Sequence, residues 1–469
     1  MKKNIIISGI TLLICLYFSS CKKFLDVQSK EEVFESELLS TRDGVYSALN
    51  GIYQGLSDQD LYGKELTMGY MDALAQYYDT QSSYSPYFLS YKFNYDIKDY
   101  KNIFTMIWSK QYRLLLEINV LLENLEDPAF QVLAAEERDL LIGELYAVRA
   151  FLHFDLLRLF GPVYSSQPDE RGIPYSSQQS LTAKPMLSAK DVMERIRQDL
   201  DRSLELLKND PVLQYNGGPV QKYSSDYSSL RYFRFNYYAC LLLSARVSLY
   251  AGDRKLALEH ATKLIQETVN KFPFIANQAE ALSDPVFSSE TLFAIQNRNL
   301  NLIYNAYFNP ALTDDEILAP HRLAQIYSSE NDYRYVAWSS SGDIGDKNYR
   351  VFGKYSNISG KIAPNLEYFQ PLIRKSEAYL IAAEAEPDLA KGQSYLQSLQ
   401  IHRGLDPDLP PQPTQQALLE ALTAEYTREF WGEGQLFFYY KRKNITTIPG
   451  SREKTNFLPP LPTVETDFR

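Results

Sequence analysis

Cysteine is scarce in this chain of 469 residues, which contains only three. Cys15 lies within the apolar segment near the start of the chain, Cys21 ends that segment, and Cys240 lies in an apolar stretch that we expect to be helical. After removal of a leader, the mature chain would have no plausible internal disulfide. This excludes the disulfide framework of small secreted domains, and Cys240 is expected to be a small core residue.

Histidine and the common catalytic motifs are also scarce. The sequence has four histidines, none of them in a metal-ligand spacing such as HExxH, and it has no GxSxG elbow, no P-loop and no CxxC pair. Asp343 and Asp346 lie on a Gly/Ser loop and have the chemistry to contact calcium, but their spacing is not that of an EF-hand, so a solvated turn is favoured. We expect no metal site, no cofactor and no enzyme activity.

Positive charge is not in excess either. The formal net charge is −10, with 48 Lys and Arg against 58 Asp and Glu. A protein that binds nucleic acid needs a basic surface to neutralise phosphates. The charge therefore predicts no nucleic-acid partner.

Long hydrophobic runs are absent except at the start of the chain. Residues 5–18 form an apolar run after Lys2 and Lys3, and it is shorter than the roughly 20 residues that span a bilayer. The run ends in Phe-Ser-Ser-Cys, which resembles the cleavage box of a bacterial lipoprotein. We predict a signal peptide at residues 1–20, lipidation of Cys21 and a tether at 21–30; an ordinary cleaved signal with an incidental cysteine is the alternative.

Tyrosine is abundant, by contrast, with 36 Tyr and 24 Phe but only 3 Trp. Because each tyrosine hydroxyl needs a hydrogen-bond partner, many of these residues are expected to be partly exposed. One interpretation is that they cap a helical stack with their hydroxyls in water. The functional interpretation is a surface whose aromatic faces stack against the apolar faces of sugar rings.

Residues 143–164 form the most strongly patterned segment. Its apolar side chains fall on two stripes at helical spacing, so the predicted helix must be covered on two sides. Gly161-Pro162 is expected to end it, with glycine tolerating a left-handed residue. Arg149, Asp155 and Arg158 lie within the apolar pattern and are interpreted as structural ion pairs, because buried charges need partners.

Two predicted helix pairs carry small residues at the same offset. Ala245 and Ala257 lie twelve positions apart across a turn at Gly252-Asp253, and Ala378 and Ala390 lie twelve apart across Pro387-Asp388. Tetratricopeptide helix pairs place small residues at such an offset because the two helices approach closely there. Coincidence in Ala-rich helices is the alternative. Repeats of this kind bury a core only by stacking, so several pairs are implied.

Residues 271–364 interrupt the helical pattern. This part is rich in Asn, Ser, Asp, Tyr and Gly, with a possible strand at 291–296 and a helix near 321–327. Its many aromatic residues argue against disorder, so we interpret it as a large irregular insertion with a function. We predict two parts, residues 31–270 and 271–469, in a mainly α tetratricopeptide-like scaffold with large irregular loop insertions.

Four segments resemble one protein family. RAFLHFDLLRLFGPVY at 149–164 is similar to the signature helix of the SusD/RagB family of outer-membrane nutrient-binding lipoproteins. RKSEAYLIAAEA at 374–385 and REFWGEGQLFFYYKR at 428–442 are similar to its later and C-terminal helices, and CKKFLDV at 21–27 to its start. The four segments occur in the expected order over nearly the whole chain.

The resemblance implies a lipoprotein on the outer face of the outer membrane. Such a protein would bind an oligomeric nutrient, most simply a glycan, and pass it to a SusC-type TonB-dependent transporter. Some relatives are associated with peptides, and the sequence does not separate the two. A helical-repeat adaptor that binds another protein and no small ligand is the remaining alternative, since tyrosine also favours protein interfaces.

Ligand contact is expected from two tyrosine-rich loop regions, 70–87 and 333–338. The family's binding residues lie in variable loops, so this expectation comes from composition and loop position alone. The candidates are Asp72, Tyr77, Tyr78, Tyr84, Tyr87, Arg334 and Trp338.

Overall fold

The computed structural model describes residues 37–180, 182–215, 230–338, 347–356, 366–407 and 414–466. The chain divides into two units, residues 1–50 and 51–469, and α3 (Arg42–Leu56) carries it from the first into the second. In the first unit, Thr41 accepts a hydrogen bond from the Gly44 backbone at the start of α3. Cys21, the predicted leader and the tether lie outside the described residues.

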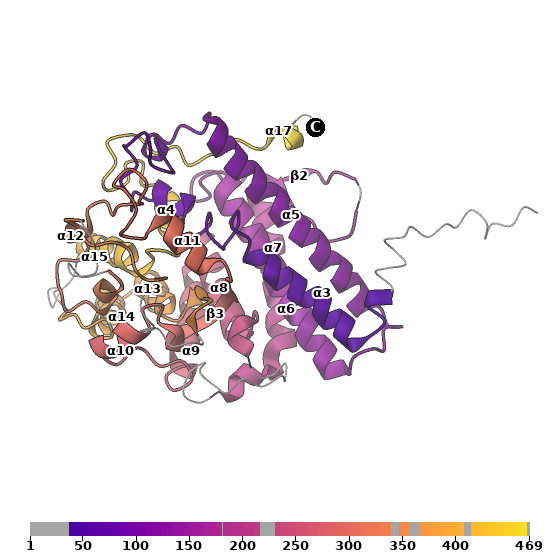
Figure 1. Cartoon of the computed structure of the whole chain (residues 1–469). Coiled ribbons are helices and arrows are strands. Elements are labelled where there is room, and N and C mark those ends of the chain that lie inside the picture. The colour runs from indigo at the N-terminus through magenta and orange to yellow at the C-terminus, as the bar shows by residue number, and fades with distance from the viewer. Residues whose placement is uncertain are drawn as a thin grey trace, which may run out of the picture. The chain divides into compact units, whose positions relative to one another are not determined.

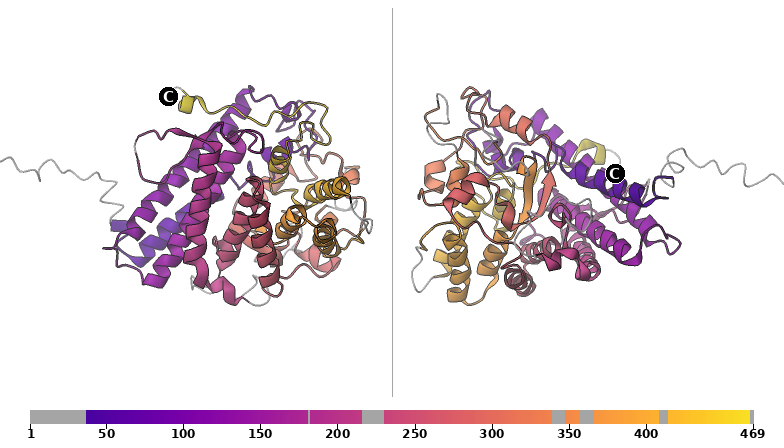
Figure 2. Two further views of the ribbon diagram at one scale, coloured as in Figure 1. Left: turned by 180° about the vertical axis from the view of Figure 1, so that it is seen from behind. Right: turned by 60° about the horizontal axis from the view of Figure 1, so that its bottom comes forward.

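The second unit is built on a series of long helices. They are α5 (Lys98–Glu126), α6 (Ala135–Phe160), α7 (Ala189–Leu206), α8 (Tyr237–Tyr250), α9 (Arg254–Glu267), α13 (Ser376–Ala385), α14 (Leu389–Ile401) and α15 (Gln415–Glu429). Each packs against the next in this order, so α13 continues the series directly after α9 (Figures 1 and 2). The fold is the mainly helical, tetratricopeptide-like scaffold that the sequence predicts.

Helix α6 is covered on both sides, as its two apolar stripes predict, and nearly every residue after Leu141 is buried. The charged residues within it are paired: Arg149 holds Asp199 through two hydrogen bonds of 2.6 and 2.7 Å, and Asp155 pairs with Arg158. The interpretation of these charges as structural ion pairs is confirmed.

The conformation predicted for Gly161, at the end of α6, is wrong. Gly161 follows the helix with φ of −80°, so it does not adopt the left-handed conformation expected of it. A Cβ at this position would lie 2.6 Å from the carbonyl oxygen of Leu157. Glycine is needed at Gly161 for space, not for a positive φ.

The first predicted helix pair is present, with α8 packed against α9 across the predicted turn. Ala245 on α8 and Ala257 on α9 are both fully buried. Gly252 turns the chain with φ of +86°, and Asp253 caps α9 by accepting a hydrogen bond from Leu256 N. This pair is confirmed.

The second helix pair exists, but its small residue is a different one. Ala378 is buried on α13, whereas Ala390 is exposed on α14. The close approach lies at Gly392, where a Cβ would be 2.8 Å from the Ala383 carbonyl oxygen. The Ala378–Ala390 assignment is therefore wrong, because Ala390 faces solvent and Gly392 is the small residue of α14 at the contact.

Two short antiparallel pairs accompany the helices. Strand β1 (Arg171–Pro174) pairs with β2 (Met186–Ser188), and β3 (Thr291–Gln296) pairs with β4 (Phe369–Arg374). Strand β3 has the predicted bounds. All six residues of β4 are buried, and so short a buried run has no periodicity that distinguishes strand from helix.

In the described residues of the irregular part, the elements are short, as expected. Besides β3 they include α10 (Gln278–Ser283), α11 (Leu300–Tyr307), α12 (Leu323–Ile326) and the 3-10 turn η7 (Tyr333–Ala337). Elsewhere lie α4 (Tyr70–Leu74), α16 (Leu436–Arg442) and α17 (Thr463–Thr466). The ion pair of Arg246 with Glu377 crosses the predicted boundary at residue 270, and the division of the chain there stays a prediction. None of the helices in the described part is long and apolar enough to cross a membrane.

Segment 428–442 is not one helix. Helix α15 ends at Glu429 and α16 begins at Leu436, with a turn between them in which Gly432 and Gly434 have φ of +83° and +68°. Left-handed glycines point successive backbone N–H groups to one side and form an anion-binding concavity. This turn places a buried carboxylate, described next.

Candidate functional site

Asp72 fills the turn between α15 and α16. Its carboxylate accepts hydrogen bonds from Gly432 N at 2.6 Å and Gly434 N at 3.1 Å, and its side chain is fully buried. Burial raises the pKa of Asp72 although both N–H groups favour the charged form. Asp72 therefore joins α4 to the last helices of the scaffold.

Three of the candidate tyrosines are also interior residues. Tyr77, Tyr78 and Tyr87 are at most 3% exposed. Their hydroxyls donate inside the protein: Tyr77 to Thr427 O (2.7 Å), Tyr78 to Met68 O (2.9 Å) and Tyr87 to Glu65 Oε2 (2.9 Å). Burial raises the pKa of all three hydroxyls, so each remains a neutral donor.

Arg334 and Trp338, from the second candidate region, face inward as well. Arg334 is 5% exposed and makes ion pairs with Asp332, Glu425 and Glu429. Trp338 is 2% exposed, and its ring packs edge-on against Trp431 at 4.4 Å.

Tyr84 is the one candidate at the surface, with 74% of its side chain exposed. The other six occupy interior positions, so their side chains are not presented to a ligand in this conformation. Direct ligand contact by those six stays a prediction, and the geometry favours a supporting role for them.

Arg334 belongs to a buried charge cluster that the sequence did not reveal. Glu429 sits at its centre, within 2.5–2.8 Å of Arg334, Arg374 and Arg403. Burial would raise the pKa of Glu429, but the three guanidinium groups outweigh it and hold that pKa well below its ordinary value. Glu290 accepts from Arg374 and Arg403 in the same cluster, which ties the irregular region to the scaffold.

The exposed Tyr84 lies on a surface that we name the loop surface: Ser82, Tyr84, Asp314, Asp315 and Tyr349. Ser82 Oγ donates to Asp315 at 2.6 Å, and Tyr349 OH donates to Asp314 at 2.9 Å. Lys347 and Tyr349 lower the pKa of the exposed Asp314, so it is an ionised acceptor at neutral pH. Three segments far apart in sequence therefore present one aromatic and acidic surface.

Backbone hydrogen bonds hold the first two of these segments side by side. Asp79 N donates to Ala319 O at 2.9 Å, and His321 N donates to Tyr77 O at 2.7 Å. The interior ring of Tyr87 stacks on Tyr307, which lies at the end of α11. The buried candidates thus fix the loops from which Tyr84 projects.

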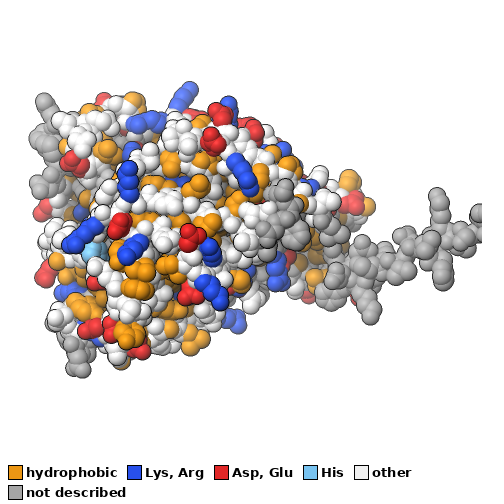
Figure 3. All heavy atoms as spheres, turned by 90° about the horizontal axis from the view of Figure 1, so that it is seen from above, with side chains coloured by type: hydrophobic (Ala, Val, Ile, Leu, Met, Phe, Trp, Pro, Cys, Tyr) orange, Lys and Arg blue, Asp and Glu red, His pale blue; other side chains and the backbone are white. Residues whose placement is uncertain are grey.

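Helix α11, which precedes the segment that carries Asp314 and Asp315, also has exposed polar side chains. Asn305 accepts from Asn309 at 2.9 Å and donates to Asn301 at 3.4 Å, and Leu302 is 64% exposed among them. Seen from above, hydrophobic side chains are interspersed with charged and uncharged polar ones (Figure 3).

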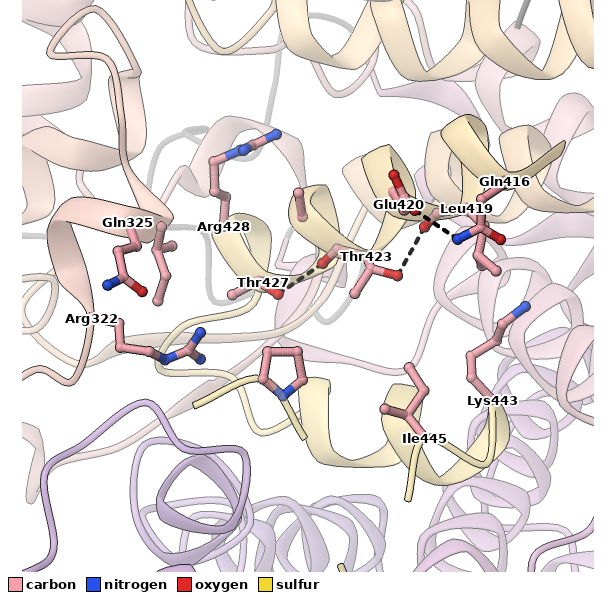
Figure 4. Close-up of a pocket in the computed structure, with 13 residues that line it drawn as sticks. Arg322, Gln325, Gln416, Leu419, Glu420, Thr423, Thr427, Arg428, Lys443 and Ile445 are labelled. Atoms are coloured by element: carbon pink, nitrogen blue, oxygen red, sulfur yellow. Dashed lines mark hydrogen bonds between the residues drawn. The ribbon is translucent and has the colours of Figure 1, made fainter. Parts of the chain in front are cut away.

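A separate pocket of about 440 Å³ lies between α12, α15 and the segment after α16 (Figure 4). Arg322 and Gln325 line one side, Thr423 and Thr427 project from α15, and Ile445 lies opposite (Figure 4). The described residues contain no group of three or more His, Cys, Asp or Glu side chains able to hold a metal ion.

Comparison with known proteins identifies the family. A model of SusD-like proteins, described as "starch-binding associating with outer membrane", matches residues 23–222, and the SusD family model matches residues 324–454. The chain belongs to the SusD/RagB family. That family is described by starch binding and membrane association, not by catalysis, in agreement with the expectation that the chain is not an enzyme.

Individual relatives of this SusD/RagB protein are distant. A SusD-like protein of Formosa agariphila is 23% identical over 289 residues, and the match covers 59% of this chain but only 48% of that relative. A SusD superfamily protein of Bacteroides thetaiotaomicron is 20% identical with a TM-score of 0.68, covering 91% of this chain and 98% of the other.

Two further solved structures share the fold. A SusD-like carbohydrate-binding protein of Bacteroides vulgatus is 20% identical with a TM-score of 0.66, covering 86% of this chain and 83% of the other. A laminarin-binding SusD-like protein is 17% identical with a TM-score of 0.65, covering 91% and 97%. At these identities the likeness establishes the fold alone.

Proposed function

We propose that this protein binds an oligosaccharide outside the cell at the loop surface and delivers it to a SusC-type TonB-dependent transporter. Membership of the SusD/RagB family supports the nutrient-binding role. The carbohydrate-binding and laminarin-binding proteins of the same fold support a glycan as the ligand. Transfer to the transporter would require only modest affinity.

The observation that carries this proposal is the exposed ring of Tyr84 among hydrogen-bonding groups. Sugar rings have apolar faces that pack against aromatic rings and hydroxyls that bond to carboxylates and amides. Tyr84, 74% exposed, supplies such a ring, and Asp315 lies within hydrogen-bonding distance of the neighbouring Ser82. Buried contacts beneath these loops keep the groups in place before a ligand arrives, which reduces the entropy lost on binding.

The anchor is part of the same proposal. Residues 1–20 would be removed, Cys21 would carry the lipid, and residues 21–30 would form the tether. Parts 31–270 and 271–469 would then form the scaffold outside the membrane. Stable anchoring by lipid requires more than one acyl chain, which a lipoprotein cysteine provides.

Affinity gel electrophoresis with a panel of polysaccharides, laminarin among them, tests the glycan. We expect retardation by one of them, with Tyr84→Ala weakening binding about tenfold, as for the loss of roughly 1.4 kcal/mol. Tyr395→Ala is the matched control, because Tyr395 is a half-buried tyrosine on α14, a helix that contributes no residue to the loop surface. It should leave retardation unchanged.

Two outcomes would contradict this proposal. Equal retardation of the Tyr84→Ala variant and the parent protein would remove the loop surface from glycan binding. Failure of every polysaccharide to retard the protein, together with binding of peptides, would favour the peptide-binding alternative. Co-purification with another protein and no small ligand of either kind would favour the adaptor.

A further inference from the structure

Arg322 lies at one side of the pocket between α12 and α15. In Figure 4 its guanidinium points into the space between α15 and the segment that carries Ile445. The pocket, of about 440 Å³, is within the range of small-molecule sites in proteins.

The charge of Arg322 has no carboxylate partner in the described part of the chain. Its Nε and Nη2 atoms are buried and donate no hydrogen bond there. The other cations of the pocket are paired, Arg428 with Glu425 at 2.5 Å and Lys443 with Glu384 at 3.2 Å. Burial lowers the pKa of Arg322, as expected for a cation without an anion beside it.

The backbone conformation at Arg322 and Gly450 determines where this guanidinium lies. Arg322 has φ of +62°, an unfavourable value for a residue with a side chain. Gly450, with φ of +97°, makes room for it, because a Cβ there would lie 2.3 Å from Arg322 Nε. Strained conformations of this kind persist where the surrounding structure over-determines them and are common in ligand sites.

The remaining walls of the pocket are largely apolar and hold no aromatic ring. Ile326, Leu419, Ala424 and Ile445 supply aliphatic surface. Such walls suit an aliphatic group better than a sugar ring, which favours aromatic stacking. The pocket thus combines one unneutralised guanidinium with aliphatic surface, while Glu420 and Thr423 add polar groups on the α15 side.

We propose that this pocket binds a small carboxylate with an aliphatic body, of the kind found at the C-terminus of a peptide, with Arg322 pairing to the carboxylate. A guanidinium attracts a carboxylate by its charge and donates hydrogen bonds to it, which gives both affinity and orientation. The aliphatic body would lie against Leu419 and Ile445. This site is independent of the loop surface and does not require that the protein bind a glycan.

A ligand-observed NMR titration of the purified full-length protein tests this site. The probes are N-acetyl-leucine, its uncharged amide N-acetyl-leucinamide, and galacturonic acid as a carboxylate on a sugar. We expect N-acetyl-leucine to bind at least tenfold more tightly than the amide or galacturonic acid. Arg322→Gln should abolish that preference for the carboxylate.

Two further variants keep the test decisive. Lys443→Gln is the matched control in the same pocket and should change affinity less than twofold, because Glu384 already neutralises Lys443. Ala424→Glu adds a carboxylate at an exposed position of α15, so it should fold normally and weaken N-acetyl-leucine binding by competing for the guanidinium. Equal binding of acid and amide, unchanged binding by Arg322→Gln or Ala424→Glu, or preference for galacturonic acid would each overturn the proposal.

Discussion

At the scale of single residues, His153 shows how the interior of α6 accommodates a polar side chain. The Ser176 N–H donates to its Nε2 at 2.9 Å, so Nδ1 carries the proton that is donated to Arg149 O at 2.9 Å. The ring stacks on Tyr175 with centroids 3.8 Å apart. Burial lowers the pKa of His153 to about 3, which keeps the imidazole neutral at physiological pH.

This shift predicts a specific loss of stability in acid. The unfolded chain binds a proton at His153 below its ordinary pKa of 6.5, whereas the folded chain does so only near 3. Between these values the unfolded state holds more protons, so the free energy of unfolding should fall by about 1.4 kcal/mol per pH unit as pH decreases. Urea unfolding of the parent protein and of His153→Gln from pH 7 to pH 4 measures it.

The variant should be less stable at pH 7, because it loses the stacking on Tyr175, but its stability should depend less on pH within this window. His402→Gln, at an exposed histidine, is the control. Parallel pH dependence in the parent and His153→Gln would show that other groups cause the acid sensitivity.

The composition shows that this protein is rich in aromatic residues, but it does not predict which tyrosines face solvent. Tyr77 and Tyr84 lie in one polar, tyrosine-rich segment, yet the first is fully buried and the second is 74% exposed. The difference arises because the Tyr77 hydroxyl meets Thr427 O, which is 350 positions away in sequence. The residues near Tyr77 in the sequence do not identify so distant a hydrogen-bond partner.

At the scale of elements, α15 is the helix on which the buried charges converge. Glu425 and Glu429 lie one turn apart on it and together neutralise Arg334, while Arg403 reaches Glu429 from the end of α14. The helix thereby connects η7, β4 and the α14 end. Burying these charges is costly on its own, so the cluster is stable only when every member is paired.

Glu429→Gln should therefore be strongly destabilising. The change leaves Arg334, Arg374 and Arg403 buried with too few anions, and breaking a buried pair in this way costs about 3–5 kcal/mol. Urea denaturation at pH 7 measures the loss. Glu420→Gln, at an exposed position on the same helix, should change stability by less than about 0.5 kcal/mol. A loss below 1 kcal/mol for Glu429→Gln would contradict the central role of this carboxylate.

Element prediction succeeds here where the pattern is long and fails where it is short. Helix α6 follows from its sustained apolar stripes. Ser188 and Thr414 cap α7 and α15 by accepting hydrogen bonds from Asp191 N and Ala417 N. The strand β4 and the break at Gly432 do not follow from the sequence. Strand β4 depends on pairing with β3, and the break depends on the buried Asp72 that its N–H groups hold.

At the scale of the molecule, different features of the sequence determine the helical series of the second unit and the loop surface. A TM-score of 0.68 at 20% identity shows that the scaffold tolerates wide changes in sequence. The loops owe their arrangement to particular contacts, such as Ser82 with Asp315 and Asp79 with Ala319, that no repeat pattern encodes. The fold was therefore predictable, whereas the positions of the site residues were not.

The proposed lipid anchor and the proposed ligand site should be separable in the whole molecule. Cys21→Ser removes the thiol that would carry the lipid and leaves every described residue unchanged. We expect the variant to appear in the soluble fraction of cells, unlabelled by palmitate, while its retardation by the cognate polysaccharide equals that of the parent. Cys240→Ser is the matched control: its thiol is fully buried, with its pKa raised to about 12 by burial, so lipid labelling should persist. Membrane retention and labelling of the Cys21→Ser protein would refute the anchor, and lost glycan binding in a folded, soluble Cys21→Ser protein would show that the two functions are coupled.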